Sequence, residues 1–79
     1  MDNALKQRLW VSEDPTSLTQ VIFSPDPVAV IMGTNIGHLP LGNAPDDPYE
    51  AEKFAIEIAE NYHLIEDIGF ADEVGKEKE

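Results

Sequence analysis

Residues 47–60 read DPYEAEKFAIEIAE, and this stretch predicts the principal helix of the chain. Asp47 supplies a side-chain acceptor at the N-cap, and Pro48 stands at the first helical position, where no backbone donor is needed. Glu50 follows at the third helical position, as in a capping box, and the acidic residues complement the positive end of the helix dipole. The helix is therefore expected to begin at Asp47.

The same stretch is amphipathic over its whole length. The polar arc carries Glu50, Glu52, Lys53, Glu57, Glu60, Asn61 and His63. The apolar arc carries Ala51, Phe54, Ala55, Ile58, Ala59, Tyr62 and Ile65. This spacing predicts a helix that packs through Phe54, Ile58 and Tyr62 and ends near residues 67–69.

The residues before the helix predict strands. Residues 9–11 are short and β-prone, and residues 18–24 alternate, with Ile22 on one face and Val21 and Phe23 on the other. Residues 28–32 form a continuous apolar run, which is typical of a strand covered on both faces. Residues 36–41 predict a last strand, which Pro40 would place at the edge of the sheet. Residues 3–9 fit both a helix and a strand.

These elements predict one α+β domain over residues 1–70. Its two layers would be a small antiparallel sheet of three to four strands and one C-terminal amphipathic helix. Residues 71–79 are acidic, with only Val74 to bury, and are expected to form a disordered tail. No apolar run reaches the length of a membrane helix, so no membrane partner and a cytoplasmic location are expected.

The charge of the chain favours one class of partner. Its 79 residues include 16 acidic and 5 basic side chains, a net charge of −11, with most of the acidic residues after residue 43. A surface this negative repels the phosphate backbone of DNA or RNA, and it is steered towards basic protein surfaces. Acidity also serves simply to keep a small protein in solution, and this alternative stays open.

Catalytic and metal sites are not predicted. His38 and His63 are the only imidazoles, and the chain contains no cysteine. Glu60 and His63 have the spacing of a metal-binding helix, but such sites need ligands from facing helices. We therefore expect a protein that is not an enzyme and that has no catalytic residues, no metal and no cofactor.

Partner-binding residues are predicted on the polar side of the helix. Ile56 and Leu64 lie outside the apolar arc, so they would give the acidic face two apolar anchors. Trp10, the only tryptophan, fits both a core position and an interface anchor, since tryptophan is enriched at interface hot spots. The candidate partner-binding residues are Trp10, Glu52, Ile56, Glu57, Glu60 and His63.

The layout of residues 28–68, a short strand run followed by Asp-Pro-Tyr-Glu-Ala-Glu-Lys-Phe-Ala-Ile-Glu-Ile-Ala-Glu, resembles that of small phage-encoded accessory proteins. This resemblance implies an anti-CRISPR or other anti-defence inhibitor, acting in the host cytoplasm as a nucleic-acid mimic on the basic surface of a larger protein. The residues leave two alternatives. One is a self-associating structural or adaptor subunit, with Trp10 and Leu39 in the homo-oligomer interface. The other is a small-ligand sponge formed at an oligomer interface.

Overall fold

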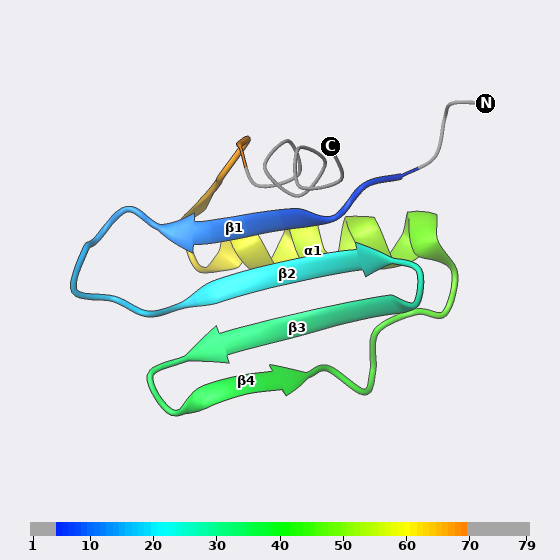
Figure 1. Cartoon of the computed structure of the whole chain (residues 1–79), viewed down its shortest axis with the longest axis horizontal. Helices are drawn as coiled ribbons and strands as arrows, with labels where there is room; N and C mark the ends of the chain where they lie inside the picture. The colour runs from blue at the N-terminus through cyan, green and yellow to red at the C-terminus, as the bar shows by residue number, and fades with distance from the viewer. Residues whose placement is uncertain (1–4, 70–79) are drawn as a thin grey trace, which may run out of the picture.

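The computed structural model describes residues 5–69, which form an antiparallel sheet and one helix. The strands are arranged in the order β4-β3-β2-β1-β5, and α1 covers one face of the sheet (Figure 1). The predicted α+β fold is thus confirmed, with five strands in the sheet. The predicted acidic tail, residues 71–79, lies outside the described residues. The elements are β1 (Arg8–Ser12), β2 (Gln20–Pro25), β3 (Val28–Thr34), β4 (Gly37–Pro40), α1 (Pro48–Asn61) and β5 (Leu64–Glu66).

The first four strands form a meander of consecutive hairpins. The turn between β3 and β4 needs Gly37, whose φ of 132° is one that residues with a Cβ rarely adopt. β4 lies at the edge of the sheet, where the missing N–H of Pro40 costs no ladder bond, as the sequence predicts. β1 begins at Arg8, so residues 5–7 belong to neither a helix nor a strand.

Helix α1 begins as the sequence predicts. The backbone N–H of Glu50 donates a 3.0 Å hydrogen bond to Oδ2 of Asp47, which is the N-cap, and Pro48 occupies the first turn. The side chains that α1 buries most deeply are Ala51, Ala55 and Ala59.

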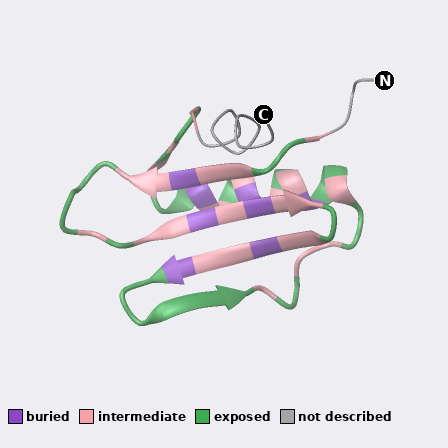
Figure 2. Cartoon of the chain, in the orientation of Figure 1, coloured by how far each residue is buried: buried purple, intermediate pink, exposed green. Residues whose placement is uncertain are grey.

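These alanines pack in a core with large side chains from the sheet. Phe23 of β2 lies opposite Val30 of β3 and Val21 of β2 lies opposite Trp10 of β1, so all four side chains point towards α1. Buried residues alternate along β2, at Val21 and Phe23, whereas Trp10 is the one fully buried residue of β1 (Figure 2). The centre of the helix interface is therefore a row of small residues, which lets the helix approach closely.

The expectation that α1 packs through Phe54, Ile58 and Tyr62 is confirmed for Phe54 and Ile58 and wrong for Tyr62, and the residues buried most deeply are the alanines. Phe54 and Ile58 are half-buried beside the alanine row, and Tyr62 is 55% exposed. The alanines occupy one side of the predicted apolar arc, and Phe54 and Ile58 occupy the other. The buried face is therefore rotated towards Ile56, which also packs against the core.

The expected end of the helix near residues 67–69 is also wrong. α1 ends at Asn61, and the chain reverses through Tyr62 and His63, whose φ is 59°. The N–H of Tyr62 donates to the carbonyl of Ile58 and that of His63 to the carbonyl of Glu60, which satisfies the last turn. Ile65, expected on the helix, lies instead in β5, which pairs with the otherwise free edge of β1.

The alanine row leads to a prediction about stability. Ala55→Leu should lower the free energy of unfolding by about 1–3 kcal/mol, because the larger side chain forces α1 away from the sheet. Chemical denaturation at a fixed protein concentration measures the change. Lys53→Leu, on the outward side of the same helix, is the matched control and should shift the value by less than about 0.5 kcal/mol. Equal losses in both variants would contradict close packing at the alanines.

Candidate partner-binding site

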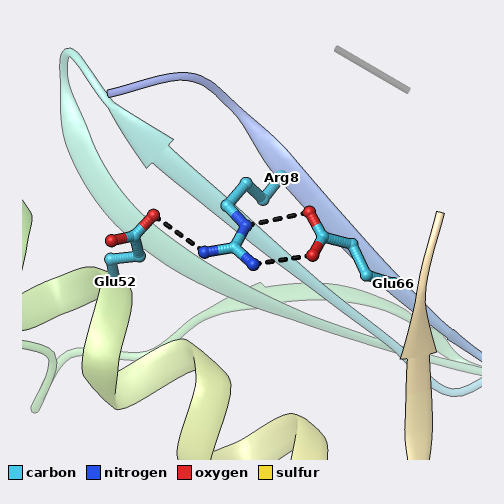
Figure 3. A network of polar contacts seen from close by, with 3 residues as sticks. All are labelled: Arg8, Glu52 and Glu66. Carbon is cyan, nitrogen blue, oxygen red and sulfur yellow. Dashed lines mark hydrogen bonds and ion pairs between the residues drawn. The ribbon is translucent and has the colours of Figure 1, made fainter. Parts of the chain in front are cut away.

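A network of ion pairs fixes one of the predicted residues, Glu52 (Figure 3). Arg8 Nη1 donates a hydrogen bond of 2.8 Å to Glu52 Oε2 on α1. On its other side, Arg8 Nε donates to Glu66 Oε2 at 2.9 Å and Nη2 donates to Glu66 Oε1 at 2.6 Å. The guanidinium also lies 4.8 Å from the centre of the Trp10 ring. One side chain of β1 thereby connects α1 and β5.

The network changes the proton affinities of its members. The hydrogen bonds from Arg8 hold the pKa of Glu66 below its ordinary value, since they favour the carboxylate form. The same hydrogen bonds, which Glu66 accepts, raise the pKa of the Arg8 guanidinium, with a further contribution from Glu52. Glu52 is therefore occupied by an internal ion pair, and contact with a partner would compete with that pair.

The structure does not bring the other predicted residues together into a mixed acidic and apolar patch. Trp10 is only 5% exposed and lies in the core, so of its two interpretations the structure supports the core position. Ile56 and Leu64 are half-buried and pack against that core, so neither is the outward-facing anchor that the sequence suggests. Glu57, Glu60 and His63 are exposed.

Four exposed charged residues of α1 form one line along the outward side of the helix, which we call the acidic ridge. They are the acidic residues Glu50, Glu57 and Glu60 and the basic residue Lys53. Lys53 Nζ lies 3.9 Å from Glu50 Oε2, so the one basic residue of the ridge is close to a carboxylate. At 1.5 Å per residue, the ridge extends over about 15 Å of the helix axis. Asp46 and Asp47 are also exposed and precede it directly.

His63 does not continue the helical face that carries the ridge. Its left-handed backbone lies beyond the C-cap, so the helical spacing between Glu60 and His63 is not kept. Over residues 5–69, no group of three or more histidine, cysteine or acidic residues could hold a metal ion. The helix found in that range is neither long nor apolar enough to cross a bilayer.

Sequence reasoning missed a second surface, the face of the sheet opposite α1, which we call the open face. Figure 1 looks onto this face, with α1 behind it. None of its strand positions carries Asp, Glu, Lys or Arg, whereas Arg8 and Glu66 point to the helix side. The strand residues of the open face are Leu9, Val11, Gln20, Ile22, Ser24, Ala29, Ile31, Gly33, His38, Pro40 and Ile65.

The signals for the open face were present in the sequence. Ile22 alternates with Val21 and Phe23, and the apolar run of residues 28–32 predicts a strand covered on both faces. Within the described residues α1 covers one face, so Ala29 and Ile31 lie on a face that no element covers. Because neighbouring residues of a strand point to opposite faces, a core position for Trp10 places Leu9 and Val11 on the open face.

Comparison of the chain with protein-family models, with curated proteins and with solved structures finds no match.

The Arg8 network predicts a pH dependence of stability. Because the pKa of Glu66 is lower in the folded chain, the unfolded chain binds more protons below about pH 4.3, the ordinary glutamate value. The stabilisation is complete above that pH and is lost as the pH falls towards the folded-state pKa. Glu66→Gln should therefore be less stable than the wild type near neutral pH, and the two unfolding free energies should converge in acid.

The control for this pH dependence is Glu57→Gln, on the outward side of α1. Its stability curve should run parallel to that of the wild type. The pKa of Asp14 is also lowered, by hydrogen bonds from the backbone N–H and the hydroxyl of Thr16. The unfolding free energy of Glu66→Gln should therefore still depend on pH, but less steeply than that of the wild type. A Glu66→Gln curve that stayed parallel to the wild type would contradict a stabilising role for this ion pair.

Proposed function

We propose that this chain is a non-enzymatic acidic binding protein that inhibits a larger protein by occupying a basic, nucleic-acid-binding surface. The observation that carries the proposal is the acidic ridge, in which three exposed carboxylates lie along one capped helix. Regular secondary structure holds such groups at fixed separations, so a basic surface can match them without ordering a flexible segment first.

Little positive charge offsets the ridge. The described basic residues are Lys6, Arg8 and Lys53. Arg8 is engaged by Glu52 and Glu66 on the inner side of the sheet, and Lys53 lies beside Glu50. With Asp46 and Asp47, the line of carboxylates extends over about 20 Å. A field of one sign over this distance attracts the lysines and arginines that otherwise bind phosphates.

Two exposed aromatic residues can supply apolar contact in place of the half-buried Ile56. Tyr49 precedes Glu50 at one end of the ridge, and Tyr62 is the C-cap at the other; each is 55% exposed. Tyrosine is enriched at binding hot spots because it combines a large apolar ring with a polar hydroxyl. In this proposal, charge steers the encounter and the tyrosines hold the docked complex.

The resemblance to phage accessory proteins suggests the class of partner. A nuclease or another nucleic-acid-binding defence protein of the host offers the basic groove that the ridge would fill. Inhibition would then be competitive, because the protein and the nucleic acid would use the same lysine and arginine side chains.

The test compares two charge reversals of equal size. Glu57→Lys/Glu60→Lys places positive charge on the ridge, and Glu13→Lys/Asp14→Lys makes the same change in the loop between β1 and β2. Immobilised wild type, the ridge variant and the loop variant are used to capture partners from host lysate at low and high salt. The ridge variant should bind the captured partner at least roughly tenfold more weakly, and the loop variant should bind like the wild type.

The captured partner is then assayed for nucleic-acid binding with and without the wild-type protein. Competition that weakens as salt rises is the expected result, since screening reduces the attraction between the charged surfaces. Two outcomes would contradict the proposal: a partner that binds the ridge variant as tightly as the wild type, or a partner that binds this chain and nucleic acid at the same time.

A further inference from the structure

The open face departs from the usual pattern of a sheet covered on one side, because both faces of this sheet carry large apolar residues. Such sheets place apolar residues against the core and polar residues towards water. Here the helix side holds the core together with Arg8 and Glu66. Among residues 5–69 no element covers the other side, on which lie Leu9, Val11, Ile22, Ile31 and Ile65. None of these five belongs to the core or packs against it, and Ile65 is 47% exposed.

We propose that the open face binds a second copy of this chain, giving a dimer in which two sheets pack face to face. This interface uses residues on the opposite side of the sheet from the acidic ridge, so it goes beyond the proposed function. Two copies related by a two-fold axis need one self-complementary patch, and a largely apolar sheet face meets that requirement.

The charge distribution favours a second copy over a charged partner. Two chains of net charge −11 repel each other through most of their surfaces, but the strand positions of the open face carry no acidic residue. A basic protein or a nucleic acid would find no charge to pair with there. In the dimer the two α1 helices lie on the outside, and three layer spacings of about 10 Å place them about 30 Å apart. This separation exceeds the Debye length of about 8 Å, so the repulsion between the two acidic ridges is largely screened.

The size of the open face also fits a dimer. Five strands spaced by about 4.8 Å make a sheet about 24 Å wide, and strands of four to seven residues in its main part are about 13–23 Å long. The projected area is therefore roughly 450 Å² per copy. The two copies together bury a projected area of roughly 900 Å². The accessible area is larger because side chains project from the face, so it approaches the lower limit of about 1,200 Å² for specific interfaces.

Self-association through the sheet edges is less favourable. One edge strand, β4, contains Pro40, and the other, β5, has only three residues. A proline and a short strand both oppose the addition of a further strand. The residues first expected in a homo-oligomer interface lie elsewhere, since Trp10 is in the core and Leu39 pairs with Met32 on the helix side. Packing through the open face is therefore favoured over pairing at the sheet edges.

Sedimentation equilibrium of the full chain at micromolar concentration tests the dimer. The expected mass is twice the 8.8 kDa of one chain. The dimer dissociation constant should fall as salt is raised, because salt screens the repulsion between two acidic chains. Binding through the acidic ridge has the opposite salt dependence, and Glu57→Lys/Glu60→Lys should remain dimeric. Failure of the dimer and failure of the proposed function are therefore distinguishable.

Two isoleucines of one hairpin provide matched variants. Ile31→Lys places a charge in the interface and should raise the dimer dissociation constant roughly a hundredfold or more. Ile36→Lys makes the same change at the tip of the β3–β4 turn, where Ile36 is 92% exposed, and should remain dimeric. The added lysine lowers the net negative charge in both, so stronger repulsion cannot explain a difference. Fluorescence of the buried Trp10 reports whether each variant is folded.

A second measurement does not depend on a disruptive substitution. The chain contains no cysteine, so Ile22→Cys introduces a single thiol near the middle of the open face. Oxidation should cross-link two copies of Ile22→Cys, and Ile36→Cys should cross-link far more slowly. A wild type that stays monomeric at all salt concentrations would overturn the proposal. So would equal cross-linking of the two thiol variants, or dimers that persist in a folded Ile31→Lys.

Discussion

The close contact between α1 and one face of the sheet is the interaction on which the rest of the structure depends. Ala51, Ala55 and Ala59 let the helix backbone lie near Val21 and Phe23, so the bulk of the core comes from the sheet. This arrangement fixes the rotation of the helix about its axis. The side opposite the alanines is necessarily the acidic ridge, and the far side of the sheet necessarily lacks a helical cover among the described residues.

The charged residues of the strands complement this contact. Arg8 and Glu66 point to the helix side, at its margin, where Glu52 completes the ion pairs. All three side chains keep roughly a quarter of their surface exposed, so the desolvation cost is smaller than in a fully buried pair. Their joint effect is geometric, since they hold a three-residue strand against β1. Charge is thereby kept off the open face.

Local signals in the sequence were sufficient for part of the fold and for part of the site. The helix start at Asp47, the alternation of β2 and the edge position of Pro40 each depend on neighbouring residues, and each is confirmed. The same periodicity places Glu57 and Glu60 outward. β5 could not be predicted, because Tyr62 and Ile65 continue the helical spacing and only the free edge of β1 decides between helix and strand. The role of Glu52 likewise depends on Arg8, 44 positions away.

The pairing of β1 with β5 has a consequence for the order in which the chain can fold. β1 to β4 are connected by short loops, so their pairing closes small segments of chain. The contact between Arg8 and Glu66 instead closes 58 residues, which is most of the chain. Because the entropic cost of closure grows with the length of chain enclosed, this contact costs more than the hairpins, and it is expected to form after them. In a chain growing on the ribosome, β1 can pair with β2 early, but its other edge stays unpaired until β5, near the end of the described residues, has been synthesised.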